Sequence, residues 1–557
     1  MTGDRWPTDT DGAARRGRLS RGAAAALLPH PATPLGATLL WGRAVLPGWS
    51  DALTRLAGAD GAGASATPTA TATANVAASG SMIDAAPLGS FVNGYLYLDD
   101  GALSLATAIG DPSYERHVAW VLATAEWPAL AISTAMASSS RATRPQLPES
   151  LDIELHERVD ALVRQLRSVV TDHIVASEAL KTAISVLDAT RVGLRDSVSV
   201  IGDALVTLEP SHRVWDLSRT VRSSSVLTQI FDEGSAGLDD RLEARRDEPD
   251  VRAFRQALVW LVERYGVLGG NGWDLDAPTW EQRPDLALRA VSWLRIHDDA
   301  ADPRRRQSEQ RAARHGALSD SLTALAGGPE SVSQANAART AVSRFLGWRS
   351  RTRLNCLTLV AELRMVFGEL GQRWSAAGLL NDSSHVLMLE GDELREVLDD
   401  PGAFSLVAAD RHELWRALAT HEPVATIDAG DALPVADAVP QRLAARSRGR
   451  RARTLVGIPG SAGTVAGPSR VLRDGSDVAN LARGDVAVVA DADPAWVPAL
   501  VGVAGLIVES GGWAGHAVVA CRELGVPCVV GADHVIRTVR DGTMLELDGT
   551  TGTIRIV

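Results

Sequence analysis

The residues best suited to chemistry lie in the stretch ESGGWAGHAVVACRELGVPCVVG, which runs from Glu509 to Gly531. A histidine, His516, follows a glycine-rich turn and opens a run with helical periodicity. A neutral imidazole is a competent nucleophile near pH 7, because one ring nitrogen can attack while a hydrogen bond holds the other. The first N–H groups of a helix and its positive dipole end suit an anion, a phosphoryl group in particular. The pattern therefore fits two roles: a phosphoryl carrier, or a histidine that merely caps the helix.

The elements that must position His516 can be predicted from the residues around it. GLIVES reads as a buried strand, and HAVVACRELG reads as a helix that stops at Gly525, with Pro527 just beyond. The turn between them lacks side-chain bulk at three positions, Gly511, Gly512 and Gly515. Glycines let the backbone turn sharply and let a ligand approach closely. We therefore expect His516 at a strand–loop–helix apex.

Composition and periodicity divide the rest of the chain. Residues 1–20 are polar and are expected to be a disordered tail, and residues 57–81 read as a low-complexity insertion. FVNGYLYLDD then predicts a β-hairpin, and residues 151–420 show helical periodicity with proline- and glycine-rich breaks after Tyr265 and Ile296. These features predict a helical domain at 21–424, a linker at 425–453 and a compact α/β domain at 454–557.

The overall composition limits the partners and the chemistry. A net charge of -12 argues against nucleic acid, and no apolar run approaches the length of a membrane span. The three cysteines form no CxxC pair, so we expect no metal site and a reducing, cytoplasmic location. Lys181 is the single lysine, and no G-x-x-x-x-G-K-[ST] loop occurs. Self-contained ATP chemistry is therefore not expected.

Four blocks at the C-terminal end carry a family resemblance: VGIPGSAGTVAGPSRVL, GDVAVVADADPAWVPAL, GLIVESGGWAGHAVVACRELGVPCVVG and DGTMLELDGTTGTIRIV. In this order they resemble the phosphohistidine swivelling domain of phosphoenolpyruvate synthase, pyruvate phosphate dikinase and rifampicin phosphotransferase. The resemblance covers residues 455–557 and implies a β/β/α fold with His516 as the phosphoryl-carrying residue. The residues it places around the phosphoryl group are Gly511, Gly512, Gly515, Ala517 and Arg522.

One departure from this family lies directly before the histidine. The family usually has Ser or Thr there, whereas this chain has Gly515. A hydroxyl would cap the helix or touch the phosphoryl group, so its loss implies slower or differently supported transfer. It also leaves open a chain whose carrier function has decayed.

The preceding part of the chain resembles the substrate-binding domain of rifampicin phosphotransferase. The segments LLPHPATPLGATLLWG, LVERYGVLGGNGWDLDAPTWEQRPD and RSRTRLNCLTLVAELRMVFGELGQRW are collinear with that family. The resemblance implies a multidomain protein, with a mainly α-helical substrate-binding domain followed by the C-terminal α/β swivelling domain. At four positions where the family has titratable or charged residues, this chain has Val267, Leu268, Gly272 and Thr279. Their loss implies a different acceptor or a different activating base.

Candidate acceptor-site residues follow from side-chain chemistry. Arg349, Arg351 and Arg353 could clamp a phosphoryl or carboxylate group, although a solvated helix start explains them equally well. Trp273 and Trp280, together with Asp274, could line a pocket for an extended apolar substrate, or could be core or lid residues. The sequence identifies no general base. Five histidines in helical patterns lack ligand spacing and are expected to be packed or surface residues: His117, His156, His173, His297 and His412.

Together the resemblances imply a phosphoryl carrier and an acceptor domain without a donor site. We expect a separate ATP-grasp protein to hold ATP and Mg²⁺ and to phosphorylate His516, with no cofactor bound by this chain itself. The swivelling domain would travel across the 425–453 linker to a hydroxyl of a natural-product or antibiotic-like molecule. Three alternatives stay open: a dehydratase that uses phosphorylation to make a leaving group, a non-catalytic binding subunit, and a self-sufficient enzyme.

Overall fold

The computed structural model describes residues 19–20, 27–28, 30–59, 89–92, 95–99, 118, 121–122, 144–189, 208–269, 271–323, 328–399, 404–420, 423, 426–427, 454–473, 475–491, 496–513 and 515–557. Residues 1–18 of the predicted tail, residues 60–81 of the predicted insertion and residues 428–453 of the predicted linker lie outside these ranges. Two compact units emerge from the contacts: residues 1–204, 273–276 and 320–444 form the first, and residues 205–272, 277–319 and 445–557 form the second. The domain boundaries drawn from the sequence stay a prediction.

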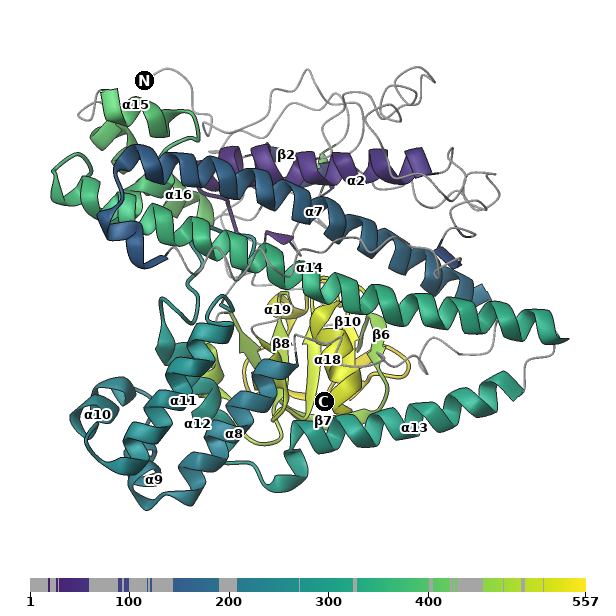
Figure 1. Ribbon diagram of the computed structural model, residues 1–557. Coiled ribbons are helices and arrows are strands. Elements are labelled where there is room, and N and C mark those ends of the chain that lie inside the picture. Colours follow the sequence, from purple (N-terminus) through teal and green to yellow (C-terminus); the bar gives the residue numbers. More distant parts are fainter. Residues whose placement is uncertain are drawn as a thin grey trace. The chain divides into compact units, whose positions relative to one another are not determined.

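The first unit is built on long helices whose apolar faces meet. Its helical segments are η2 (Gly36–Val45), α2 (Leu46–Ala59), η4 (Arg144–Glu149), α7 (Asp152–Ala189), α14 (Gly328–Ala376), η6 (Ser383–Met388), α15 (Glu393–Asp399) and α16 (Phe404–Ala419). Helix α7 packs along α14 and α2 (Figure 1). Leu155, Val159, Leu162 and Leu166 of α7 are buried against this core, which confirms the predicted spacing of three and four residues.

A small antiparallel sheet belongs to the same unit. Strands β2 (Gly89–Val92) and β3 (Tyr95–Asp99) pair from Val92 to Tyr95, as the hairpin prediction requires. Two short strands, β1 (Leu19–Ser20) and β4 (Thr426–Ile427), complete the order β2-β3-β1-β4. These last strands fall within the predicted tail and linker. Strand β1 is ordered by pairing with β3, and β4 is ordered by pairing with β1. This pairing uses backbone groups, so no side-chain pattern in the sequence indicates it.

The second unit begins with a bundle of helices. These are α8 (Glu209–Ser223), α9 (Ser225–Asp232), α10 (Leu238–Ala244), α11 (Pro249–Tyr265), α12 (Pro284–Arg295), η5 (Asp299–Ala301) and α13 (Pro303–Thr323). The gap between α11 and α12 confirms the first predicted break, and the short turn before α13 confirms the second. Proline stands at the first position of α11, α12 and α13, where its missing N–H costs nothing.

The remainder of this unit is an eight-stranded sheet in the order β5-β12-β11-β7-β8-β9-β10-β6. Its strands are β5 (Thr454–Val456), β6 (Ile458–Ser461), β7 (Thr464–Leu472), β8 (Val486–Val489), β9 (Gly505–Val508), β10 (Cys528–Val530), β11 (Met544–Asp548) and β12 (Thr553–Ile556). Between them lie η8 (Gly475–Asn480), α17 (Val497–Leu500), α18 (His516–Leu524) and α19 (Val535–Thr538). Strands β7 to β10 are parallel neighbours. Gly457 alone joins the two edge strands β5 and β6, so the sheet must curve back on itself.

The predicted fold class, a mainly α-helical region followed by a C-terminal α/β domain, is confirmed by this architecture. The segment GLIVES, predicted as a buried strand, corresponds to β9, whose four residues are all buried. Within the described ranges, no helix combines the length and the apolar character needed to cross a membrane.

Candidate active site

His516 is the first residue of α18 and stands at the predicted strand–loop–helix apex. The loop before it is tied to neighbouring elements at its start. Glu509 N donates to Val489 O over 2.9 Å, and the Glu509 carboxylate accepts Ile536 N over 2.9 Å. These bonds anchor the loop to β8 and α19. His516 itself is partly exposed. A nucleophile at this position is accessible to a ligand, and hydrogen bonds hold the loop before it in place.

Two glycines of the loop leave open space in front of it. Gly511 has φ +115°, a conformation that side chains with a Cβ rarely adopt. A Cβ at Gly511 or at Gly512 would meet nothing within 4 Å. The glycine at 511 is therefore required by the backbone, and the space over both residues can admit a ligand.

Gly515 is the N-cap residue of α18 and supplies no side-chain cap. Its φ of −55° is open to other residues, so the backbone does not demand glycine here. A Cβ would lie 3.1 Å from Gly512 O and 3.3 Å from a methyl group of Val518, which is tight. A serine at this position would therefore have to shift the loop by a few tenths of an ångström.

Arg522 braces the loop from inside. Its Nε donates to Gly460 O over 2.7 Å, one Nη donates to Trp513 O over 2.6 Å, and its guanidinium stacks on the Trp513 ring at 3.5 Å. The side chain is only 9% exposed. Ala517 is fully buried as well. The structure thus brings His516 and the five residues predicted around the phosphoryl group to one apex, and Arg522 donates to one carbonyl of the loop and one of β6.

A second cluster of predicted residues lies in the first unit, between α14 and the 273–276 loop. The guanidinium of Arg353 lies 4.2 Å from the centre of the Trp273 ring, and Arg353 is buried. Arg349 is one helical turn earlier on the same face. Burial lowers the pKa of Arg349 to about 10, and the charge of Arg353 adds to this effect. Two partly desolvated cations side by side favour an anionic group or an oxygen that gains negative charge.

His173 completes this cluster, although the sequence pattern had favoured a packed or surface role. It comes from α7, accepts or donates a 3.0 Å hydrogen bond with Thr352 Oγ1, and its ring lies 6.4 Å from that of Trp273. Burial holds its pKa well below the usual range, and the charges of Arg349 and Arg353 lower the pKa further. The imidazole is therefore neutral at pH 7. No sequence signal could have found it, because its neighbours lie far along the chain.

Asp274 is fixed beside this cluster through its backbone. The Arg364 guanidinium donates to Asp274 O, with Nε at 3.0 Å. The Asp274 carboxylate accepts Asp276 N over 3.1 Å. Burial raises the pKa of Asp274 to about 6, and the negative charge of Asp276 contributes. This carboxyl group therefore titrates close to neutral pH.

Two predicted residues do not join the cluster. Arg351 is two positions from Arg349 on α14, so it points to a different side of the helix. Trp280 is buried in the second unit, where its backbone N–H donates to Leu268 O over 2.6 Å. A core role fits Trp280, and a solvated role fits Arg351.

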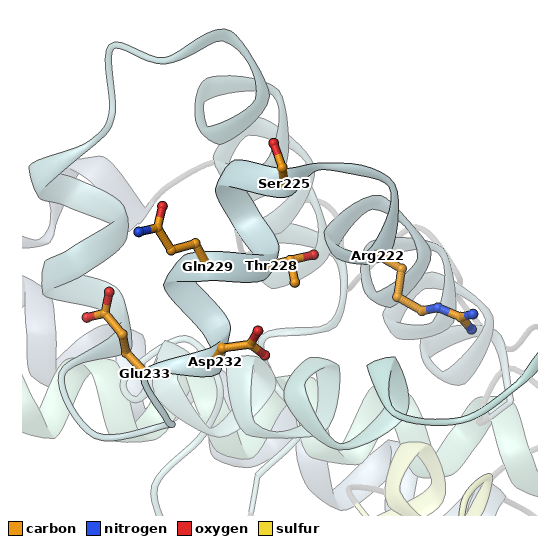
Figure 2. Close-up of a pocket in the computed structure, with 6 residues that line it drawn as sticks. All are labelled: Arg222, Ser225, Thr228, Gln229, Asp232 and Glu233. Atoms are coloured by element: carbon orange, nitrogen blue, oxygen red, sulfur yellow. The ribbon is translucent and has the colours of Figure 1, made fainter.

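A surface hollow of about 680 Å³ lies between α8 and α9 (Figure 2). Its lining is polar and consists of Arg222, Ser225, Thr228, Gln229, Asp232 and Glu233. None of the predicted site residues contributes to it. Among the described residues, no group of three His, Cys, Asp or Glu side chains is arranged to hold a metal ion.

Comparison with known families agrees with this geometry. Residues 481–552, which include the His516 loop, match the mobile domain of the PEP-utilising enzymes. The segment around His516 is therefore similar to the mobile domain of these enzymes. Residues 174–350, which include Trp273 and Arg349, match the fourth domain of rifampicin phosphotransferase.

Individual relatives that match 64–65% of this chain show a similar resemblance. The chain is 28% identical over 372 residues to rifampicin phosphotransferase of Streptomyces sviceus, covering 65% of this chain and 41% of the relative. It is 24% identical over 374 residues to the prodigiosin synthesizing transferase PigC of Serratia marcescens, covering 65% and 40%. It is 28% identical over 387 residues to chondramide synthase cmdD of Chondromyces crocatus, covering 64% of this chain and 10% of that protein. The chain thus spans about two fifths of the length of the phosphotransferases it resembles.

Proposed function

We propose that this chain is the carrier and acceptor part of a phosphotransferase. An imidazole nitrogen of His516 attacks the phosphorus of a donor, a P–N bond forms, and the bond from phosphorus to the donor's leaving oxygen breaks. A hydroxyl of a small molecule then attacks the same phosphorus, the P–N bond breaks, and a base removes the hydroxyl proton. The observation that carries the proposal is His516 at the open, glycine-bounded start of α18.

The acceptor is a hydroxylated, natural-product-like molecule. The names of the relatives support this class, since they include a rifampicin phosphotransferase, a chondramide synthase and a prodigiosin synthesizing transferase. The side chains that would stabilise the phosphoryl oxygens are Arg349 and Arg353, two cations on one face of α14.

The donor belongs to an ATP-grasp protein that binds ATP and Mg²⁺. This part of the proposal rests on the sequence, which has a single lysine and no G-x-x-x-x-G-K-[ST] loop.

The test is labelling of the full chain with γ-labelled ATP and candidate ATP-grasp proteins. Wild type should acquire an acid-labile, alkali-stable label, and His516→Ala should not. His534→Asn is a matched control, because His534 is an exposed histidine of the same domain whose φ of 60° asparagine tolerates. Label that survives in His516→Ala, or no label with any donor, contradicts the carrier role. Addition of acceptor candidates and the product mass then separate a gain of phosphate from a loss of water.

A further inference from the structure

The loop before His516 is loose by composition. Three of the five residues that precede this histidine are glycines, at positions 511, 512 and 515. Glycine loses more backbone freedom on ordering than any other residue. Gly515 also supplies no side-chain cap to α18. The backbone hydrogen bonds at Glu509 hold only the start of the loop, so another contact must fix the end that carries His516.

Trp513 is the only large side chain between Ser510 and Gly515, and it is buried. The tryptophan is 6% exposed, whereas Gly511 and Gly512 directly before it are exposed. Moving a buried indole into water exposes a large apolar area, which is unfavourable. Trp513 therefore anchors the loop from the inside, three residues before the histidine.

Arg522 holds Trp513 at two points. Its guanidinium lies 3.5 Å from the centre of the Trp513 ring, and its Nη2 donates to Trp513 O over 2.6 Å. Its Nε donates to Gly460 O over 2.7 Å. One guanidinium thus joins the ring and the backbone of the loop to strand β6.

The geometry of α18 makes this reach possible. Arg522 belongs to the last turn of the helix, six residues after His516. Side chains of a helix point back towards its N-terminus, so a long side chain from the last turn can reach the loop in front of the helix. A Cβ at Gly460 would lie 3.2 Å from Cγ1 of Val518 and 2.9 Å from Cys528 O. Glycine at 460 therefore lets β6 approach α18 closely enough for its carbonyl to accept Arg522.

The burial of Arg522 makes the contact hard to break. The residue is only 9% exposed. A charge withdrawn from water is unfavourable unless hydrogen bonds and other polar contacts replace the lost hydration. If Trp513 left its place, the guanidinium would lose an aromatic ring and a carbonyl at once. Loop conformations with Trp513 displaced are therefore disfavoured both by the exposed indole and by the buried cation.

We propose that Trp513, held by Arg522, is a positioning residue for His516. It keeps the glycine loop in the conformation that leaves open space beside the histidine. Arg522 acts through Trp513 and β6, and not as a ligand of the phosphoryl group. The effect on phosphoryl transfer rests on the proposed function, whereas the effect on the conformation of the loop does not.

Phosphorylation of the full chain by phosphoramidate tests the positioning role. An imidazole nitrogen of His516 attacks the phosphorus, a P–N bond to the ring forms, and the bond to the donor nitrogen breaks as ammonia leaves with the ring proton. Trp513→Leu should lower the rate about tenfold, because a histidine that samples many positions loses the advantage of orientation. Trp513→Phe keeps an aromatic face for the guanidinium and should restore most of the rate. A wild-type rate in Trp513→Leu, or a phenylalanine variant as slow as the leucine variant, overturns the proposal.

Substitutions of the arginine separate geometry from charge. Arg522→Lys keeps the positive charge and loses the planar group that stacks and donates at two points, so it should be as slow as Arg522→Gln. The double variant Arg522→Gln/Trp513→Leu should be no slower than the slower single variant, since both substitutions remove one contact. Arg540→Gln is the matched control, because Arg540 is an exposed arginine of the same domain. A wild-type rate in Arg522→Lys would assign the effect to charge and contradict the positioning role.

Amide hydrogen exchange of the full chain separates positioning from folding. Trp513→Leu and Arg522→Lys should raise exchange at 511–516 about tenfold and leave exchange in β8, β9 and β11 unchanged. Unchanged exchange at 511–516 overturns the proposal. A rise throughout the sheet also overturns it, because Trp513 would then support the fold alone. If phosphoramidate does not label even the wild type, the carrier function fails, and exchange at 511–516 still decides whether Trp513 holds the loop.

Discussion

The guanidinium of Arg353 lies 4.2 Å from the centre of the Trp273 ring, which joins a residue of the long helix α14 to a short loop from a distant part of the chain. Trp273 also contacts the ring of Trp41 at 6.1 Å, and Trp41 Nε1 donates to Trp273 O over 3.2 Å. The tryptophan is therefore held rigidly beneath a cation. Trp273 is only 6% exposed, so this cation and its aromatic partner belong to the buried core of the first unit.

The stacked pair predicts a measurable coupling. A double-mutant cycle of Arg353→Gln and Trp273→Leu should give an interaction free energy of about 1–2 kcal/mol in denaturant unfolding, as desolvated cation–π pairs do. The same cycle with Arg351→Gln should give a value near zero, because Arg351 lies on another side of α14. Equal coupling for both arginines would contradict the stacking geometry.

Arg349 and Arg353 should affect only one of the two transfer steps. Substituting either should slow transfer from His516 to the acceptor and leave transfer from the donor to His516 unchanged. Arg349→Gln and Arg353→Gln should slow the acceptor-dependent loss of label from His516 by about tenfold or more, since each removes a cation from the transferring group. Labelling of His516 by the donor should be unchanged. Arg351→Gln is the matched control and should transfer at the wild-type rate. The measurement is the decay of labelled protein on addition of a panel of hydroxylated natural products, rifampicin among them.

The loop glycines predict different responses to the same substitution. Gly511→Ala should cost about 1–3 kcal/mol of local strain at φ +115° and lower the rate of His516 labelling. Gly512→Ala should have little effect, because its Cβ would meet open space and its φ is not positive. Labelling rates with phosphoramidate compare the two directly. If Gly512→Ala proves the more damaging variant, the space over this loop is used by the incoming phosphoryl group.

The raised pKa of Asp274 predicts that the free energy of unfolding depends on pH. Its folded pKa of about 6 lies above the usual 3.8, so the folded state binds the proton more tightly than the unfolded state. Stability should therefore rise as the pH falls from above 6 towards 4. Asp274→Asn should be more stable than wild type above pH 6, by roughly 3 kcal/mol at most, and the difference should shrink on acidification. Thermal melts of both proteins from pH 4.5 to 8 check the sign.

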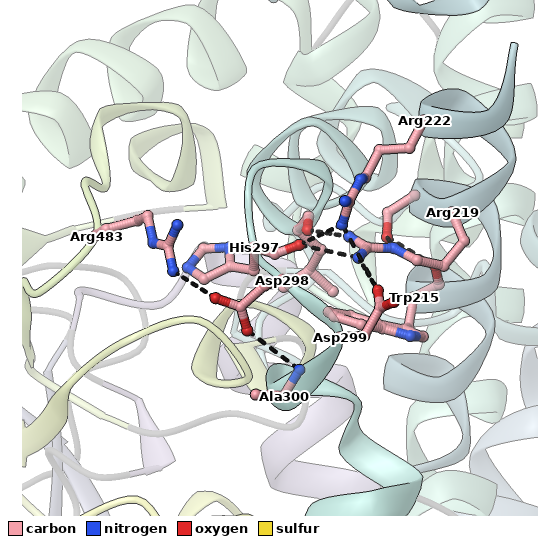
Figure 3. Close-up of polar contacts among 10 residues, drawn as sticks. Trp215, Arg219, Arg222, His297, Asp298, Asp299, Ala300 and Arg483 are labelled. Carbon is pink, nitrogen blue, oxygen red and sulfur yellow. Dashed lines mark hydrogen bonds and ion pairs between the residues drawn. The ribbon is translucent and has the colours of Figure 1, made fainter.

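The lowered pKa of His297 predicts that its contact with Gly502 weakens in acid. Burial lowers this pKa below 6.5, and the charges of Arg483 (Figure 3) and Arg306 lower the pKa too, although the carbonyl oxygens of Trp293 and Gly502 oppose the shift. Because the pKa is depressed in the folded chain, protonation weakens the contact as the pH falls through and below 6.5. Exchange at 499–503, corrected for its intrinsic pH dependence, should rise relative to the strands between pH 7 and pH 5.5. His297→Gln should abolish this extra rise.

The local structure around His516 could be predicted from the sequence because short-range rules govern it. The apolar runs VAVV and GLIV form β8 and β9, and Gly525 ends α18 with φ +66°, as a helix-terminating glycine should. The glycines of the loop and the position of His516 at the helix start follow from neighbours within a few residues. The spacing of apolar residues likewise predicted the helices of residues 151–420 and the two breaks between them.

The tertiary structure alone decided which distant side chains meet. His173 lies beside Arg349, Trp273 lies under Arg353, and Glu523 is enclosed by α13, in each case across a long stretch of sequence. Trp280 and Arg351 fitted the same sequence-based arguments, yet packing separated them from the cluster. The sequence by itself determined the elements and the place of His516 at the start of a helix, because backbone conformation and burial patterns depend on local spacing. The neighbours of that residue depend on how helices pack and which faces they turn to one another, and no short-range pattern specifies this.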